Sequence, residues 1–188
     1  LGSFSLVDDG TSANTHLSGN LTTFGTYDVS EVIPTGWSLD NIICVDPDSQ
    51  TTVDVTNGVA AINLDEGEDI TCTFYNSLIP GTIIVHKDVQ GPNGENVTDT
   101  SASFTVRLDS SDPQTFTDGG TVTYNNVTPG AHTVTEDTPP AGYDLYSMTP
   151  DSDSGTTGAQ INVPAGSTVD VYVVNRQQSS SLTLIKTV

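Results

Sequence analysis

Residues 81–88, GTIIVHKD, and residues 181–188, SLTLIKTV, share one pattern: a short run of apolar and β-branched residues that ends near a lysine. Runs of this composition predict β-strands. The lysines are Lys87 and Lys186. The first copy is followed by enough sequence for a domain, whereas the second is the last segment of the chain. The chain is therefore expected to hold two domains, the first lacking its opening strand, and one spare opening strand at the C-terminal end.

The sequence around these strands repeats along the chain. Residues 101–109, SASFTVRLD, correspond to residues 1–9, LGSFSLVDD, and residues 158–177 correspond to residues 59–77. A third pair of segments, residues 133–145 and 27–39, lies between them. Such a repeat predicts two copies of one supersecondary plan. The residues that it equates are Phe4 with Phe104, Glu31 with Glu136, Gly36 with Gly142, Trp37 with Tyr143 and Asn76 with Asn175.

Alternation of apolar and polar residues predicts strands through residues 1–79 and again from residue 81. Phe4 and Leu6 are expected to face a core, and Trp37 is expected to anchor it. Short strands separated by turn residues favour an antiparallel sandwich. The expected fold class is all-β, with an incomplete sandwich domain at residues 1–79 and a complete one at residues 80–176. Residues 177–188 hold a polar linker and the spare strand.

Charge narrows the range of partners. The chain carries 24 acidic and 4 basic residues, a net charge of −20, which disfavours nucleic acid and anionic membranes as partners. None of the basic residues lies in the first 80 positions, so the first domain has no lysine of its own. No run of residues is apolar enough to insert into a membrane, and we expect an extracellular, secreted or cell-surface protein.

The two cysteines, Cys44 and Cys72, lie in separate strand-like runs of the first domain. A disulfide between them suits an oxidising, extracellular site, whereas two reduced core cysteines are the other interpretation. We favour the disulfide.

Several of these motifs resemble a known family. TIIVHKD, NNVTPGAHTVTEDTPPAGY and VDVYVVNRQ in the second domain, with YDVSEVIPTGW and DITCTFYNS in the first, resemble the prealbumin-like, collagen-adhesin B-type (SpaA-like) repeats of prokaryotic surface proteins and pilins. SLTLIKTV resembles the opening strand of a further repeat. The resemblance implies a small immunoglobulin-like β-sandwich and a place in stalks, fibres or adhesin shafts.

The resemblance also implies a covalent cross-link. Many members of the family join a lysine of the first strand to an asparagine of the last strand through an isopeptide bond, promoted by an acidic residue. Carried over to this chain, the intramolecular pair is Lys87 and Asn175, with Glu136 as the acid. Burial pushes a lysine and a carboxyl group towards their neutral forms, which suits attack of the amine on the carboxamide. The other interpretation is that the three residues are ordinary surface or strand-end positions.

The first domain has Glu31 and Asn76 but no lysine, and the missing parts match the C-terminal segment. Family domains send their first and last strands out at opposite ends, so the short linker QQSSS would hardly return the tail to its own first domain. We therefore expect strand donation to the next molecule, a head-to-tail contact that propagates as a filament. Donor residues are Ser181, Leu182, Leu184 and Ile185, and Lys186 would reach Asn76 and Glu31 of the neighbour for an intermolecular isopeptide bond.

A second interpretation is that the chain is a segment of a longer tandem array, in which the tail opens the next repeat. The strand then still belongs to a neighbouring domain, and only its covalent continuity differs.

Other signals are weaker. Three Asn-X-Thr triplets make Asn20, Asn96 and Asn126 candidate glycosylation sites. Acidic turns at residues 46–48, 65–69 and 151–153 could hold Ca²⁺ weakly, but solvated turns explain them as well and no metal site is predicted. No catalytic triad, P-loop or dinucleotide fingerprint is present, so we expect neither an enzyme nor a cofactor.

These observations predict a structural subunit of an extracellular filament or surface stalk. The subunit is expected to form a homopolymer through its C-terminal strand, reinforced by Lys–Asn isopeptide bonds. The alternative is an adhesin or ligand-binding module from a tandem-repeat surface protein, for which an exposed aromatic platform would speak.

Overall fold

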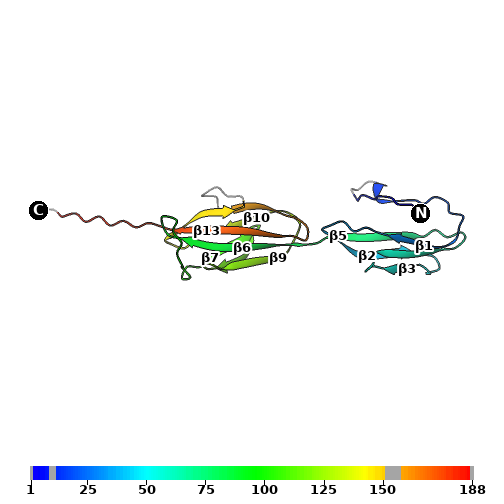
Figure 1. The fold of residues 1–188 in the computed structure, drawn as a ribbon, viewed down its shortest axis with the longest axis horizontal. Coiled ribbons are helices and arrows are strands. Elements are labelled where there is room, and N and C mark those ends of the chain that lie inside the picture. Colours follow the sequence, from blue (N-terminus) through cyan, green and yellow to red (C-terminus); the bar gives the residue numbers. More distant parts are fainter. Residues whose placement is uncertain (1, 9–11, 151–157, 187–188) are drawn as a thin grey trace. The chain divides into compact units, whose positions relative to one another are not determined.

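The computed structural model describes residues 2–8, 12–150 and 158–186, and it divides the chain into two units (Figure 1). Unit 1 comprises residues 1–77 and unit 2 comprises residues 78–188. Apart from a 3-10 turn, η1 (Ser12–Asn14), the regular structure in the described residues is β-strand. The all-β fold class is confirmed.

Unit 2 is a sandwich of two four-stranded sheets. One sheet has the order β11-β13-β6-β9 and the other has the order β12-β10-β7-β8. Within the first sheet, β6 and β13 run parallel, and β6 is hydrogen-bonded to β9 on its other edge. The strands are β6 (Gly81–Gln90), β7 (Phe104–Leu108), β8 (Ser111–Phe116), β9 (Thr121–Val127), β10 (Gly130–Glu136), β11 (Tyr143–Thr149), β12 (Gly158–Val163) and β13 (Thr168–Gln177).

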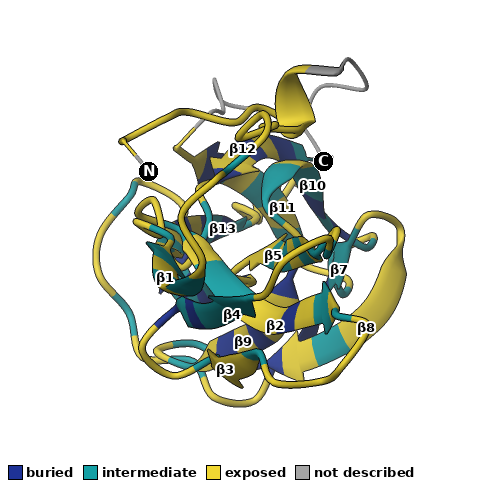
Figure 2. Cartoon of the chain, turned by 90° about the vertical axis from the view of Figure 1, so that its right-hand side faces the viewer, coloured by how far each residue is buried: buried dark blue, intermediate teal, exposed yellow. Residues whose placement is uncertain are grey.

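Side chains of unit 2 alternate between core and surface. In β6 every second residue is buried, which places Ile83, Val85, Lys87 and Val89 on the inner face. The same alternation appears as dark blue and yellow bands along β9 and β12 in Figure 2. A single apolar core lies between the two sheets and includes Phe104, with 2% of its surface exposed. Successive residues of a strand point to opposite faces of its sheet, so every second residue of these strands contributes to the core.

Unit 1 has the same layers but fewer strands. One sheet has the order β1-β4-β3, and the other pairs β2 with β5. By the sequence repeat, β5 corresponds to β13, which has a strand on each of its two edges. Among the described residues, β5 pairs only with β2, so its other edge is open. The strands are β1 (Gly25–Ser30), β2 (Trp37–Val45), β3 (Thr52–Asp54), β4 (Val59–Leu64) and β5 (Thr71–Leu78).

Two expectations for unit 1 are wrong. Residues 2–8 form no strand, and the side chains of Phe4 and Leu6 are 41% and 49% exposed. Trp37 is 40% exposed and does not anchor a core. The physical reason is shared: an alternating pattern makes a strand only where a neighbouring strand supplies hydrogen bonds and a second layer covers its apolar face.

The core of unit 1 is correspondingly small. Among its described residues the buried hydrophobic ones are Ile42 and Ala60, whereas the core of unit 2 contains 17 buried residues. Unit 1 instead exposes large apolar side chains, among them Phe4, Leu6 and Trp37. A contiguous group of exposed apolar side chains usually indicates an interaction surface.

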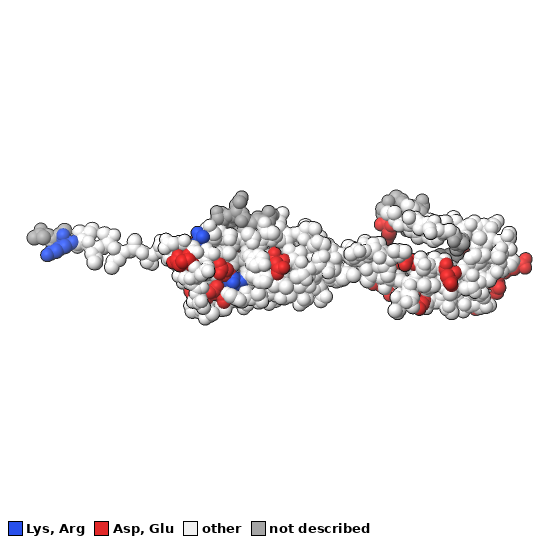
Figure 3. Space-filling model, viewed as in Figure 1, with Lys and Arg blue, Asp and Glu red and all other residues white. Residues whose placement is uncertain are grey.

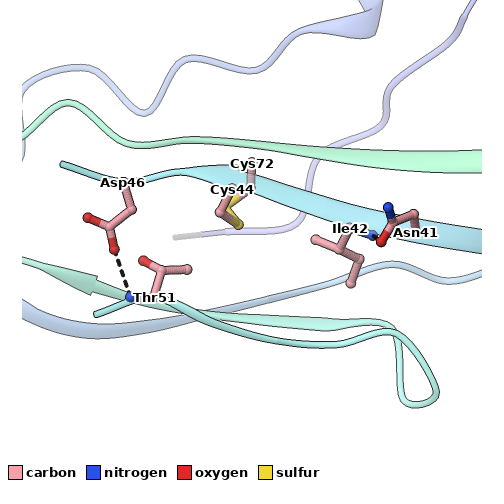
Figure 4. Close-up of a disulfide and its surroundings, with 6 residues drawn as sticks. All are labelled: Asn41, Ile42, Cys44, Asp46, Thr51 and Cys72. Atoms are coloured by element: carbon pink, nitrogen blue, oxygen red, sulfur yellow. Dashed lines mark hydrogen bonds between the residues drawn. A yellow bond between two sulfur atoms is a disulfide. The ribbon is translucent and has the colours of Figure 1, made fainter. Parts of the chain in front are cut away.

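A disulfide joins the two strands of the smaller sheet. Cys44 of β2 and Cys72 of β5 are bonded through their sulfur atoms, as Figure 4 shows, and the expected disulfide is thus confirmed. The bond closes a loop of 28 residues within unit 1. It therefore stabilises the sheet on which the open edge of β5 lies.

Acidic side chains are scattered over unit 1, and no lysine or arginine accompanies them (Figure 3). Within the part of the chain that the structure describes, no helix is long and apolar enough to cross a membrane.

Candidate isopeptide site

Three buried polar side chains meet inside unit 2. The ammonium nitrogen Nζ of Lys87 donates a hydrogen bond of 2.6 Å to Oδ1 of Asn175, and Nδ2 of Asn175 donates one of 2.9 Å to Oε2 of Glu136. Lys87, Glu136 and Asn175 are 4%, 7% and 0% exposed. The structure therefore brings together all three residues that the sequence selected for an isopeptide site in the second domain.

The strands explain why these residues meet. β6 and β13 are parallel neighbours, with Lys87 opposite Val173 and Val89 opposite Asn175. Lys87 and Asn175 therefore point to the same inner face and are offset by two residues in the register. Glu136 ends β10 in the facing sheet and reaches the pair across the core. The site thus takes its lysine from β6, its asparagine from β13 and its glutamate from β10 of the facing sheet.

The surroundings of Lys87 are apolar on one side. Its Nζ lies 4.2 Å from the ring centroid of Phe104, a residue of β7. The remaining contacts of Nζ are the backbone carbonyl oxygens of Asp88, at 2.9 Å, and Val173, at 3.4 Å. Burial lowers the pKa of Lys87 to about 8, although the carboxyl groups of Glu136, Asp118 and Asp88 act in the opposite direction. The environment thus favours the neutral, nucleophilic amine more than water does.

Glu136 is shifted in the complementary direction. Burial raises the pKa of its carboxyl group, against the lowering effects of the hydrogen bond from Asn175 and the charge of Lys87. Its Oε1 is buried without a hydrogen-bond partner. A protonated carboxyl group at this position can exchange protons with the amide of Asn175, and a neutral amine can attack the same amide. The arrangement fits a one-time acyl transfer that needs no cofactor.

Unit 1 contains the same acid and amide without a lysine. Nδ2 of Asn76 donates a hydrogen bond of 2.7 Å to Oε1 of Glu31. The other oxygens of this pair, Oδ1 of Asn76 and Oε2 of Glu31, are buried and have no hydrogen-bond partner. In unit 2 the oxygen equivalent to Asn76 Oδ1 accepts the bond from Lys87. A buried acceptor without a donor is costly, so this oxygen is suited to receive an amine.

A groove of about 1590 Å³ runs beside the pair in unit 1. Its walls include β5 from Thr71 to Asn76, the end of β1, and residues 2–6. Trp37, the single tryptophan of the chain, also lines the groove, which explains its exposure. The open edge of β5 and the unpaired oxygens therefore border one cavity.

The C-terminal segment belongs to no sheet in the described residues. Leu182, Leu184 and Ile185 are 83%, 86% and 83% exposed, and Ser181 and Lys186 are also exposed (near the end marked C in Figure 1). The expected contacts of Lys186 with Asn76 and Glu31 remain a prediction. Residues 187 and 188 lie outside the described residues.

The candidate glycosylation residues Asn20, Asn96 and Asn126 are all exposed. Asn20 and Asn96 lie outside the strands, and Asn126 lies near the end of β9. Glycosylation at these positions remains a prediction.

Two of the acidic turns come together in unit 1. Carboxylate oxygens of Asp46, Asp48 and Glu68 lie within 4.8 Å of one another. The backbone N–H of Thr51 donates a 2.7 Å hydrogen bond to Asp46 (Figure 4), and this bond is the main cause that lowers the pKa of Asp46 to about 2. The turn at residues 151–153 lies outside the described residues. Such turns are explained by their own hydrogen bonds.

The role of Phe104 was missed in the sequence. Its position in an alternating strand indicated a core residue, but nothing in the sequence placed its ring over the amine of Lys87. The repeat that equates Phe104 with Phe4 could have drawn attention to both.

Comparison with known proteins found one matching family model and several similar solved structures. Residues 3–78 match the profile of the prealbumin-like fold domain family. No curated protein sequence matches the chain. The similar solved structures include the minor pilin of Streptococcus agalactiae, with 12% identity, a TM-score of 0.40, and coverage of 70% of this chain and 65% of the pilin.

Two further structures illustrate the range of similar proteins. The major pilin of Streptococcus pyogenes has 17% identity and a TM-score of 0.39, with coverage of 86% of this chain and 73% of the pilin. A Mobiluncus mulieris adhesin containing intramolecular disulfide, isopeptide and ester bond cross-links has 18% identity and a TM-score of 0.41, with coverage of 62% of this chain and 47% of the adhesin. This chain thus spans less than two thirds of the S. agalactiae pilin and of the adhesin. The match of residues 3–78 to the model of the prealbumin-like fold domain family confirms, for this part of the chain, the resemblance that its motifs indicated.

Proposed function

We propose that this protein is a structural subunit of an extracellular, pilus-type filament or surface stalk. Subunits join head-to-tail when the C-terminal strand of one enters the groove in unit 1 of the next. Isopeptide bonds between Lys87 and Asn175 within unit 2, and between Lys186 and the neighbour's Asn76, reinforce the assembly. The observation that carries the proposal is the pair Asn76–Glu31, which repeats Asn175–Glu136 but has a buried amide oxygen without a donor.

The tail supplies what unit 1 requires. Aligning Lys186 with Lys87 places Leu182 and Leu184 on Ile83 and Val85, both of which are fully buried in unit 2. These side chains are on the same face of a strand as the lysine, because successive residues alternate between faces. The tail therefore presents two apolar side chains and one amine to the groove.

The expected pairing follows from unit 2. There β13 and β6 are parallel, with Val173 opposite Lys87. By the repeat, Phe74 of β5 would lie opposite Lys186. The amine of Lys186 would then reach Asn76, which follows two residues later on the same face of β5. Adding this strand converts the two-stranded sheet of unit 1 into a wider one and covers an open strand edge.

The cross-linking step is balanced without any co-reactant. The neutral amine Nζ attacks Cγ of the asparagine, so the Nζ–Cγ bond forms and the Cγ–Nδ2 bond breaks. A proton from the amine is passed through the glutamate to the departing nitrogen, which leaves as ammonia. Each bond therefore lowers the mass of the product by one ammonia.

Location follows from the same features. The Cys44–Cys72 disulfide requires an oxidising environment, as found outside the cytosol. The net charge of −20 keeps the subunits soluble until a specific contact forms. A surface filament satisfies both conditions.

The test uses the purified 188-residue chain, incubated at increasing concentration and examined by electron microscopy and denaturing gels. We expect fibres and SDS-resistant ladders whose yield rises with concentration. Lys186→Ala should abolish the ladders while leaving noncovalent association, and Lys87→Ala should leave the ladders in place. A chain that stays monomeric at every concentration, or ladders that persist in Lys186→Ala, would overturn the proposal. Monodisperse particles that bind an added ligand would favour an adhesin module.

A further inference from the structure

Unit 2 shows how an aromatic ring completes the isopeptide site. Phe104 on β7 lies with its ring centroid 4.2 Å from Nζ of Lys87 and is 2% exposed. β7 reaches this position by pairing with β10, where Val106 is opposite Glu136. The strand that carries the ring is therefore hydrogen-bonded to the strand that carries the acid. The ring covers the amine on this side, and such exclusion of water disfavours the charged form of the amine.

Unit 1 contains the equivalent residue in a different arrangement. Phe4 stands in Ser3–Phe4–Ser5 as Phe104 stands in Ser103–Phe104–Thr105. Its ring stacks on His16 with centroids 3.9 Å apart, and it is 41% exposed. Phe4 and His16 line the same groove as Glu31 and Asn76. The aromatic residue is thus beside the acceptor site without being buried in it.

The strand edge that would receive residues 3–8 is open. β1 pairs with β4 on one edge and has no strand on its other edge among the described residues. In unit 2 the equivalent edge of β10 is occupied by β7. By the repeat, Leu6 would lie opposite Glu31 as Val106 lies opposite Glu136. One hydrogen bond between the described backbone groups, from the N–H of Val7 to the carbonyl of Ala13, ties the segment to its present position.

We propose that Phe4 is a positioning residue for the cross-link at Asn76. When a donor strand fills the groove, residues 3–8 pair with the free edge of β1, and the ring of Phe4 leaves His16 and covers the incoming amine. The inference rests on the proposed function, because it concerns the lysine that a donor strand brings to Asn76. Phe4 takes no part in proton transfer; it acts by excluding water from the amine.

The acidic groups around the groove affect the protonation of an incoming amine, so the position of the Phe4 ring affects its reactivity. The titratable groups that line it are Asp8, His16, Asp28, Glu31, Asp69 and Tyr75, with no lysine or arginine. Carboxylates stabilise an incoming ammonium ion, which is unreactive, so the acidic groove by itself opposes the chemistry. An apolar ring over the amine acts against that effect. Loss of the ring should therefore slow bond formation more than it weakens strand binding.

The experiment separates binding from bond formation. The acceptor is the full chain carrying Leu184→Asp and Lys186→Ala, so that its own tail neither competes nor reacts, and the probe is the synthetic peptide SLTLIKTV. Fluorescence anisotropy of a dye-labelled form of the peptide measures occupancy of the groove. Intact mass measures the covalent product at saturating peptide across a range of pH. Phe4→Ala, Phe4→Leu and Phe4→Trp are compared with Phe24→Ala, which removes a 47% exposed ring of unit 1 that does not line the groove.

Phe4→Ala is expected to lower the rate at saturation about tenfold, since one unit of pKa difference changes the reactive fraction by that factor. The alkaline limb of its pH–rate profile should move to higher pH, because a hydrated amine holds its proton more tightly. Phe4→Leu and Phe4→Trp should restore much of the rate, and Phe24→Ala should match the parent. Amides of residues 5–8 should gain protection from hydrogen exchange when the peptide binds.

The outcomes distinguish the two proposals. If the parent acceptor neither binds nor reacts with the peptide, strand donation itself is wrong. If it reacts and Phe4→Ala reacts at the same rate with the same pH profile, the role of Phe4 is wrong. Exchange at residues 5–8 that does not change on binding also overturns it, and this measurement needs no variant that has to fold.

Discussion

Nδ2 of Asn76 lies 2.7 Å from Oε1 of Glu31, and the amide oxygen of the same asparagine is buried without a donor. In unit 2 the equivalent oxygen, Oδ1 of Asn175, accepts a 2.6 Å hydrogen bond from Lys87. The two asparagine–glutamate pairs thus differ in that only the amide oxygen of unit 2 is hydrogen-bonded to an amine. Unit 1 contains no lysine, so no residue of this unit can supply such an amine.

Glu136→Gln is expected to suppress cross-linking in unit 2. The glutamine amide can still accept the hydrogen bond from Asn175 but cannot shuttle a proton, and loss of a general acid–base group typically slows a reaction by about 10²–10⁴-fold. Intact mass after a fixed time checks this: the parent should be one ammonia lighter than the sum of its residues after correction for the disulfide. Glu31→Gln, the same change in unit 1, is the matched control and should leave the deficit at Lys87 unchanged. A full deficit in Glu136→Gln would remove the glutamate from the reaction.

The pH dependence of stability should reveal whether Lys87 is a free amine. In Asn175→Ala the amine cannot be acylated, and burial holds its pKa at about 8 rather than 10.5. Between these values the unfolded chain binds the proton more than the folded chain, so the free energy of unfolding rises with pH, by up to about 3 kcal/mol over the full interval. Below about pH 8 both states are protonated and the penalty is complete.

The cross-linked parent should show no such rise, because an amide nitrogen does not titrate. Chemical denaturation of unit 2 between about pH 7 and pH 10 makes the comparison. The upper limit avoids Tyr124, whose pKa burial raises to about 12 and which therefore destabilises unit 2 above the ordinary tyrosine range. Equal slopes in the two proteins would contradict a cross-link at Lys87.

Leu184→Asp should prevent strand donation. In the proposed register Leu184 takes the place of Val85, which is fully buried in unit 2, and an unpaired carboxylate there costs several kcal/mol. Ile185→Asp is the matched control, because Ile185 takes the place of His86 on the outer face of the strand. Gel ladders and sedimentation should show loss of polymer for the first change and little effect for the second. Equal effects would mean that the tail does not bind in this register.

Loss of the disulfide should destabilise unit 1 selectively. Replacing Cys44 and Cys72 by alanine releases a loop of 28 residues, which in the loop-entropy description costs about 3 to 4 kcal/mol. Calorimetry of the Lys186→Ala chain, which forms no covalent polymer, should resolve a lower transition for unit 1 and an unchanged one for unit 2. If the transition of unit 2 falls instead, the units do not unfold independently.

The sequence by itself determined that unit 2 consists of β-strands. The β-branched run of β6 was sufficient to predict that strand, because strand propensity is local. Ile84 is apolar as well, so the packing of the two sheets, and not alternation in the sequence, set the inner face of Ile83, Val85 and Lys87. The sequence also selected Lys87, Glu136 and Asn175, through a repeat and a family resemblance, and it favoured the Cys44–Cys72 disulfide. The fold then buries these three polar residues, and burial shifts the pKa values of Lys87 and Glu136 towards their neutral forms.

Only the tertiary structure decided which alternating segments of unit 1 become strands. Phe4 and Trp37 have the pattern of core residues, yet they are exposed, because the sheets on which they would pack lack neighbouring strands among the described residues. Hydrogen-bonding partners of a strand come from distant parts of the chain or from another chain, and local alternation carries no information about whether they are present. The same reason explains why the unpaired oxygen of Asn76 and the position of Phe104 over Lys87 emerged only in three dimensions.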